Sequence, residues 1–246
     1  YNEQEVLPET SKRLKEKMES LMERNLISRD SRIMFVNDGS KDRTWSMIEE
    51  LHEQDPIFAG VKLSRNRGHQ NALLGGLMTA KEYADMTISL DADLQDDIDV
   101  IDQMVEKYYD GCEIVYGVRS ARTTDTFFKR FTAESFYHMI SMMGGEIVFN
   151  HADYRLMSKR ALEEMAKYKE VNLFLRGIVP MIGFKTDVVT YERHERMAGE
   201  SKYPLKKMLA LAIDGITSLS TKPIRFIVFL GLFIFLCSIG MLIYSL

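Results

Sequence analysis

The stretch that decides the fold class is Met86-Thr87-Ile88-Ser89-Leu90-Asp91-Ala92-Asp93-Leu94-Gln95. A short apolar and β-branched run that stops at acids is typical of a buried strand, which delivers its carboxylates to the carboxyl edge of a sheet. Open α/β sheets place their ligand crevice at that edge. Asp91, Asp93 and Gln95 stand at alternate positions and offer only oxygen atoms, which suits Mg²⁺ or Mn²⁺ held together with a substrate's phosphates.

Three more acids, Asp96, Asp97 and Asp99, follow this stretch. Because acidic residues favour helix N-termini, a solvated acidic loop before a helix is the alternative to a metal site. The spacing alone leaves both interpretations open, and the rest of the sequence favours the metal site.

Strands and helices alternate on either side of this stretch. Alternation at this pace is typical of an α/β fold, with a mostly parallel sheet and helices on both faces. Hydrophobic patterns predict helices at 8–25, 43–54, 69–83 and 98–109, and strands at 33–36, 58–63, 86–90 and 113–118. Beyond residue 119 the pattern loosens, with helices predicted at 127–143, 162–168 and 204–221, an apolar mixed segment at 174–182, a strand at 185–191 and a polar loop at 194–203.

The C-terminal segment 224–246 has Arg225 as its only charged residue. The roughly 20 uncharged residues after it are long enough to cross a hydrocarbon core of about 30 Å. A buried core helix is the alternative, but few soluble helices are apolar on all sides over such a length. By the positive-inside rule, the basic residues Lys206, Lys207, Lys222 and Arg225 predict that the preceding domain lies on the cytoplasmic side of the cell membrane.

Composition limits the classes of protein to consider. With 246 residues, 46% of them hydrophobic and 28% charged, the chain suits one large α/β domain or a medium domain with an appendage. The formal net charge of -4 gives no reason to expect nucleic acid as a partner. Cys112 and Cys237 lie far apart, which argues against a disulfide framework and fits a reducing compartment.

Seven segments, in this order along the chain, resemble the polyprenyl-phosphate glycosyltransferases. These are inverting enzymes of the GT-A (Rossmann-like) fold, and they include dolichol-phosphate mannose synthases and bactoprenol glucosyltransferases. The segments are YNE (1–3), VNDGSKD (36–42), LSRNRG (63–68), DADLQD (91–96), GVR (117–119), DYRLM (153–157) and RMAGESKY (196–203). Any one of them could arise by chance, but the ordered set hardly could.

The chain departs from the family pattern at its ends. The family's first strand is present only from Tyr1, so we expect a strand upstream, and only one membrane span is visible where bactoprenol enzymes usually carry two. Processive synthases of the wider superfamily carry the motif Gln-x-x-Arg-Trp. The only tryptophan of this chain, Trp45, follows Asp42-Arg43-Thr44 and does not complete this motif, so polymer synthesis is not expected. The resemblance implies a cytoplasmic catalytic domain at 1–203, an amphipathic juxtamembrane helix at 204–222 and a transmembrane helix at 223–246.

The resemblance also implies how the donor is held. Asp93 and Gln95 would bind the metal ion directly, and Asp91 would contact the sugar or ribose, or reach the metal through water. As alternatives to nucleotide binding, Asp38 could be a turn or helix-cap residue, and Arg65 and Arg67 could lie in a solvated loop. The residues implied for the nucleotide are Tyr1, Glu3, Asp38, Arg65, Arg67 and Asp91.

A polyprenyl monophosphate acceptor has a second pKa of about 6, by analogy with phosphoserine, so it is largely dianionic at neutral pH and needs no protein base. Cations are needed instead, and arginine matches phosphate geometry well. The candidates for the acceptor phosphate are Arg119, Lys129, Arg130, Arg155, Arg196 and Lys202.

The roles of two sets of residues stay open at this point. Lys129 and Arg130 could equally belong to a solvated helix face or contact lipid head groups. Asp153 is either a base or positioning residue, or a structural partner of Arg155. The residues implied as catalytic are Asp91, Asp93, Arg119 and Asp153. The histidines at 69, 138, 151 and 194 show no metal-ligand spacing and are interpreted as surface or packing residues.

These observations predict a metal-dependent, membrane-anchored hexosyltransferase. It would move a sugar from a nucleotide-sugar, with UDP-glucose favoured, to undecaprenyl or another polyprenyl phosphate, and the lipid-linked sugar would serve cell-surface glycan modification. UDP-N-acetylglucosamine and GDP-mannose are alternative donors. A nucleotidyltransferase and a non-catalytic membrane scaffold are alternative functions, and a homo-oligomer stays open.

Overall fold

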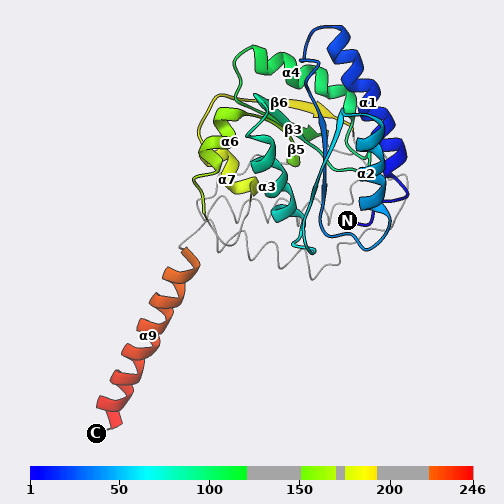
Figure 1. Cartoon of the computed structure of the whole chain (residues 1–246). Helices are drawn as coiled ribbons and strands as arrows, with labels where there is room; N and C mark the ends of the chain where they lie inside the picture. The colour runs from blue at the N-terminus through cyan, green and yellow to red at the C-terminus, as the bar shows by residue number, and fades with distance from the viewer. Residues whose placement is uncertain (121–150, 170–174, 193–221, 246) are drawn as a thin grey trace. The chain divides into compact units, whose positions relative to one another are not determined.

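The computed structural model describes residues 1–120, 151–169, 175–192 and 222–245 (Figure 1). The chain divides into two compact units, and each is described by itself. One comprises Tyr1–Thr124 with Val148–Ser201, and the other comprises Asp125–Ile147 with Lys202–Leu246. The division of the chain into three functional segments stays a prediction.

Two sheets form the first unit. β1 (Ile33–Asn37) and β2 (Phe58–Lys62) pair in parallel. The larger sheet has the order β3-β5-β4-β6, in which β5 is antiparallel to both of its neighbours while β6 is parallel to β4. β3, β4 and β6 therefore share one direction, which confirms the predicted α/β class with a mostly parallel strand direction. The strands of this sheet are β3 (Met86–Ser89), β4 (Ile114–Arg119), β5 (His151–Ser158) and β6 (Thr186–Tyr191).

The central strand β5 is the element that the sequence pattern did not predict. Its alternation is interrupted by two charged residues, Asp153 and Arg155, which normally argue against a buried strand. These residues stand two positions apart, so they share one face of the strand and bind each other at 2.6 Å. Mutual pairing makes their burial tolerable, and this pairing is invisible in a hydrophobicity pattern.

Most helices of this unit were predicted. The segment 162–168 begins earlier than expected because the Ser158 side chain accepts a hydrogen bond from the Ala161 N–H at 3.0 Å and caps α6. The mixed segment 174–182 contains α7. The helices are α1 (Leu7–Glu23), α2 (Thr44–Gln54), α3 (His69–Ala80), the 3₁₀ turn η1 (Ile98–Val100), α4 (Ile101–Tyr109), α6 (Lys159–Met165) and α7 (Leu175–Met181).

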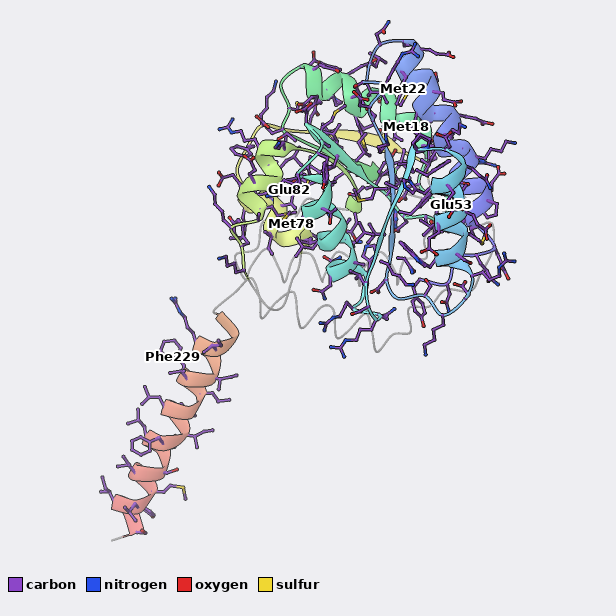
Figure 2. All side chains as sticks on the ribbon, in the orientation of Figure 1. Met18, Met22, Glu53, Met78, Glu82 and Phe229 are labelled. Carbon is purple, nitrogen blue, oxygen red and sulfur yellow. The ribbon has the colours of Figure 1, made fainter. Side chains whose placement is uncertain are left out.

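Helices cover both faces of the larger sheet, with α4 on one side and α3, α6 and α7 on the other (Figure 1). Successive residues of β4 serve the two faces, as strand geometry requires. Val115 lies in one core cluster with Met104 of α4, whereas Ile114 lies in another with Leu162 of α6. Met78 of α3, labelled in Figure 2, is partly buried against the second cluster. A third cluster joins α1, β1, β2 and α2. The larger sheet is therefore packed between α4 on one face and α3, α6 and α7 on the other.

The second unit is described only by α9 (Lys222–Ser245). Its segment Ile227–Ser245 has a mean hydropathy of 2.6 and is long and apolar enough to cross a membrane. Its large apolar side chains are exposed along the helix, Phe229 among them (Figure 2). The predicted C-terminal apolar helix is confirmed, and the predicted amphipathic helix 204–221 lies outside the described residues.

Candidate functional site

An acidic loop, defined here as residues 91–97, follows β3 at the carboxyl edge of the sheet. Asp91 is half-exposed, with 43% of its side chain accessible, whereas Asp93 and Asp96 are buried. The Asp93 carboxylate accepts the N–H of Gln95 at 3.2 Å, which forms a local turn. The residue between them, Leu94, has a φ of 54°. The three residues predicted from the alternate spacing therefore lie on one compact turn.

Three hydroxyl groups from other elements hold this loop. Thr10 of α1 donates to the carbonyl of Ala92 at 2.7 Å. Tyr191 of β6 donates to Asp96 at 2.5 Å, and Tyr154 of β5 donates to the carbonyl of Asp97 at 3.0 Å. The loop is thus fastened on both sides of Leu94.

Arg119 lies at the end of β4, next to the acidic loop. Its Nη2 donates to Asp96 at 3.3 Å, and its Nε donates to the Tyr191 hydroxyl at 3.3 Å. Arg119 and Tyr191 are also register partners at the ends of β4 and β6. The structure therefore brings one predicted phosphate-binding arginine to the predicted metal-binding loop.

Asp153 is the centre of a second polar cluster. It lies on the face of β5 opposite to Tyr154, which contacts the acidic loop. Because β5 is antiparallel, its N-terminal half lies at the carboxyl edge of its neighbours. The Asp153 carboxylate meets Arg155 at 2.6 Å, Arg176 of α7 at 3.1 Å and His69 of α3 at 3.0 Å. Burial alone would raise the pKa of Asp153, but the His69 hydrogen bond and the two arginine charges hold it well below its usual range.

Arg155 is buried, with 1% of its side chain exposed. Its Nη2 binds Asp153, while its Nε and Nη1 meet no hydrogen-bond partner among the described residues. Burial lowers the pKa of its guanidinium. The structure therefore places Arg155 in the interior beside Asp153, and a contact between Arg155 and an acceptor phosphate stays a prediction.

His69, which the sequence interpretation left as a surface or packing residue, connects the two clusters. Its Nε2 faces Asp153, and its Nδ1 lies 4.0 Å from an oxygen of Asp91. The hydrogen bond to Asp153 raises the pKa of His69, and the Asp91 charge adds to the effect. Partial desolvation raises the pKa of the half-exposed Asp91, the charge of His69 opposes this rise, and the nearby charges of Asp96 and Asp93 add to it.

The first two family segments also meet in space. The Asn2 side chain accepts the N–H of Lys41 at 3.0 Å, and the N–H of Glu3 donates to the Thr44 hydroxyl at 2.9 Å. Tyr1 is exposed at 39%. The start of the chain therefore lies on the loop that follows β1.

Asp38 closes the turn after β1. Its two carboxylate oxygens accept the backbone N–H groups of Arg67 at 2.6 Å and Gly68 at 3.0 Å. Gly39 has a φ of +63°, and a Cβ there would lie 2.5 Å from the backbone of Arg65. Asp38 therefore links the loop after β1 to the loop after β2 by hydrogen bonds. The side chains of Arg65 and Arg67 are exposed.

The remaining predicted site residues, Lys129, Arg130, Arg196 and Lys202, lie outside the described residues. In the part of the chain that the structure describes, no group of three or more His, Cys, Asp or Glu side chains is arranged to hold a metal ion. Sequence reasoning missed His69, Arg176, Asp96 and Tyr191 as site residues. Two of them had a signal, because Asp96 ends the segment 91–96 and His69 directly follows the segment 63–68.

Fold and site together define an α/β protein with an acidic loop and cationic side chains at one sheet edge. The chain belongs to glycosyl transferase family 2, whose sequence model matches residues 1–166, and it is therefore a glycosyltransferase. It is 57% identical over 238 residues to the uncharacterized glycosyltransferase YkoT of Bacillus subtilis, covering 97% of this chain and 71% of that protein.

Two further relatives complete the comparison. The chain is 44% identical to the uncharacterized glycosyltransferase YkcC of Bacillus subtilis, covering 94% of this chain and 70% of that protein. It is 41% identical to the bactoprenol glucosyl transferase of Shigella phage SfV, covering 95% of this chain and 74% of that protein. The resemblance inferred from the seven segments is confirmed.

Proposed function

We propose that this glycosyltransferase moves a hexose from a nucleotide-sugar to a polyprenyl phosphate, giving a lipid-linked sugar for cell-surface glycans. The observation that carries the proposal is the 41% identity to a bactoprenol glucosyl transferase over 95% of the chain. The same observation favours glucose, and hence UDP-glucose, as the donor. The membrane-length helix α9 fits an acceptor that resides in a bilayer.

The donor would bind along the edge formed by the loops after β1 and β3. Tyr1 and Glu3 lie beside the turn that Asp38 closes, so we assign Asp38 the task of shaping the nucleotide surface. Arg65 and Arg67 are exposed on the adjoining loop and are suited to the donor's phosphates.

Three residues of the acidic loop, Asp91, Asp93 and Gln95, fit a divalent cation shared with the donor. Mg²⁺ or Mn²⁺ bound with substrate phosphates needs only one or two protein carboxylates, so a cluster of three is not required. Desolvation and the charges of Asp96 and Asp93 raise the pKa of Asp91, so a cation beside these carboxylates would be electrostatically favoured. Asp93 and Gln95, with Asp91, would hold the ion, which would supply charge neutralisation for the departing nucleoside diphosphate.

The acceptor phosphate would act as its own nucleophile. Its oxygen bonds to the anomeric carbon as the bond from that carbon to the nucleoside diphosphate breaks, and the electron pair leaves with the diphosphate, inverting the centre. Asp153 is poorly suited to act as a base, because its pKa lies well below its usual range. We assign Asp153 a positioning role, through which it orders His69 and Arg176.

Arg119 is the described cation that we assign to the reacting phosphates. It is 27% exposed and already oriented by Asp96 and Tyr191. The resemblance adds Lys129, Arg130, Arg196 and Lys202 for the acceptor side. Because Arg155 is buried, it is not carried into this proposal as a direct phosphate ligand.

We also propose that the catalytic unit lies at the cytoplasmic face of the cell membrane. A nucleotide-sugar donor is a soluble substrate, whereas a polyprenyl phosphate keeps its phosphate at the bilayer surface. A helix of the length and hydropathy of α9 would hold the enzyme where the two substrates meet.

The test is a transfer assay with the full chain in detergent, undecaprenyl phosphate and Mn²⁺ or Mg²⁺. Labelled UDP-glucose, UDP-N-acetylglucosamine and GDP-mannose are offered separately, and a chelator serves as control. Metal-dependent label in the organic phase from one donor supports the proposal and names the sugar. No label from any donor would contradict the proposal and favour a non-catalytic membrane scaffold. A nucleotidyltransferase is tested in a separate reaction, because it would release pyrophosphate from a nucleoside triphosphate.

A further inference from the structure

The acidic loop holds a strained backbone at Leu94. Its φ of 54° lies in the left-handed region, which glycine adopts freely and leucine rarely does. Leu94 is also buried, at 5% exposure. A residue keeps such a conformation only where its surroundings enforce it, and such residues cluster at functional sites.

The enforcing contacts lie on both sides of Leu94. Before it, Thr10 holds the carbonyl of Ala92, and after it Tyr191 holds the carboxylate of Asp96. The rings of Tyr191 and Tyr154 meet edge to face with centroids 5.3 Å apart, so the two tyrosines support each other. The hydroxyl of Tyr191 is the contact that also reaches Arg119.

The loop has space into which it could relax. A cavity of about 440 Å³ is lined by Leu94, Asp96 and Asp97 on one side and by residues of α1, including Lys17, on the other. A strained turn beside such a space would be expected to shift once an enforcing contact is removed. Contacts from outside the loop therefore hold the backbone on both sides of this turn.

We propose that Tyr191 is a positioning residue of the transferase site. Through Asp96 its hydroxyl keeps the acidic loop in the strained conformation that presents Asp91 and Asp93 to the donor diphosphate. Through its contact with Arg119 it sets the arginine against the same loop. This inference rests on the proposed function, because it names a residue that prepares that same site.

The first variant is Tyr191→Phe in the full chain, which keeps the ring against Tyr154 and removes one oxygen. UDP and, separately, GDP are titrated by calorimetry with Mn²⁺ present. A hydrogen bond to a charged group is lost, so we expect about ten-fold weaker binding of the nucleotide that the wild type binds. Tyr109→Phe is the matched control, because its hydroxyl donates to the carbonyl of Leu26 at 2.8 Å and to no residue of the acidic loop.

A second pair of variants separates positioning from general loss of structure. Leu94→Ala and Leu94→Gly both remove the buried side chain, but only glycine adopts the positive φ without strain. Adding Tyr191→Phe should weaken nucleotide binding about ten-fold in the alanine background and about two-fold in the glycine background, since the two sites are coupled. A steady-state KM for the donor that follows the same order is expected.

Equal losses in both backgrounds would overturn the inference, and so would wild-type binding by Tyr191→Phe. A wild type that binds neither nucleotide would overturn it as well, because the loop would then have no donor to position. A wild type that binds UDP without transferring sugar would contradict the proposed function alone, and the binding comparison would still decide the role of Tyr191.

Discussion

At the residue scale, Asp93 carries the most specific expectation. Its carboxylate is buried at 8% exposure and accepts the N–H of Gln95. Asp93→Asn keeps an oxygen for that hydrogen bond but removes the charge, so the turn should survive while metal and diphosphate binding fail. We expect kcat/KM to fall at least about 100-fold, as for the loss of several kcal/mol of charge stabilisation.

The control for this variant is Asp97→Asn, which removes a carboxylate charge at the end of the same loop. Asp97 caps η1 by accepting the N–H of Asp99 at 2.9 Å, a task that asparagine also performs. Steady-state rates close to wild type are expected for the control. Near wild-type turnover by Asp93→Asn would refute the role of Asp93.

Asp153 carries a stability prediction. Asp153→Asn leaves the buried guanidinium of Arg155 without its counter-charge, and breaking a buried pair in this way costs about 3–5 kcal/mol of unfolding free energy. Denaturant unfolding monitored by fluorescence measures it. Asp187→Asn, which breaks the exposed pair with Lys107, should leave the unfolding midpoint almost unchanged. Similar midpoints for the two variants would contradict the account.

The pH dependence follows from the lowered pKa of Asp153. The folded state favours the ionised carboxylate, so its contribution to stability is complete above the unfolded pKa of about 3.9 and is lost as the pH falls below it. Because Asp153 also raises the pKa of His69, its pairing with protonated His69 adds stability below the unfolded histidine pKa of about 6.5. The stability gap between wild type and Asp153→Asn should therefore be largest between about pH 4 and pH 6 and narrow below about pH 4. A gap that widens as the pH falls below about 4 would exclude this cause.

Sequence reasoning selects residues whose type and spacing predict a chemical role, and it misses residues whose contacts depend on packing. Asp91, Asp93 and Arg119 could be chosen from their segments, and the structure brings them to one edge. Tyr191 and Arg176 could not, because nothing in their local sequence shows that β6 and α7 end beside the loop and Asp153. Long-range hydrogen bonds of this kind leave no periodic signal.

At the element scale, the same contrast separates β3 from β5. β3 is apolar with acids at its end, so its position was predictable. β5 is central but contains a buried ion pair, so its hydrophobic alternation fails. Antiparallel insertion of β5 is what turns Asp153 toward the edge that the parallel strands define.

Two adjacent glycines of α3 test how closely this helix packs on β1. A Cβ at Gly76 would lie 2.5 Å from a methyl group of Val36, whereas a Cβ at Gly75 would make an ordinary 3.7 Å contact with Leu63. Gly76→Ala should lower the unfolding free energy by about 1–2 kcal/mol through overpacking. Gly75→Ala should raise it by up to about 1 kcal/mol through helix propensity. Thermal unfolding of both variants decides, and the opposite order would contradict the packing.

At the scale of the whole molecule, α9 predicts how the protein partitions. Leu236→Arg combined with Ile239→Arg places two charges in the middle of the helix, at about 3 kcal/mol each for insertion. We expect this variant to leave the membrane fraction during an alkaline carbonate wash, while the matched Leu236→Ala, Ile239→Ala variant stays. A wild type that washes off would contradict a spanning role for α9.

The central claim is transfer of a hexosyl group to a polyprenyl monophosphate, and the lipid product tests it most directly. The full chain is incubated in vesicles with undecaprenyl phosphate and the donor it accepts, and the lipid and the released nucleotide are identified by mass spectrometry. The account predicts a lipid with one phosphate and one hexose, together with a nucleoside diphosphate, and neither product from Asp93→Asn. A lipid diphosphate sugar with a nucleoside monophosphate, or an unmodified lipid, would contradict it.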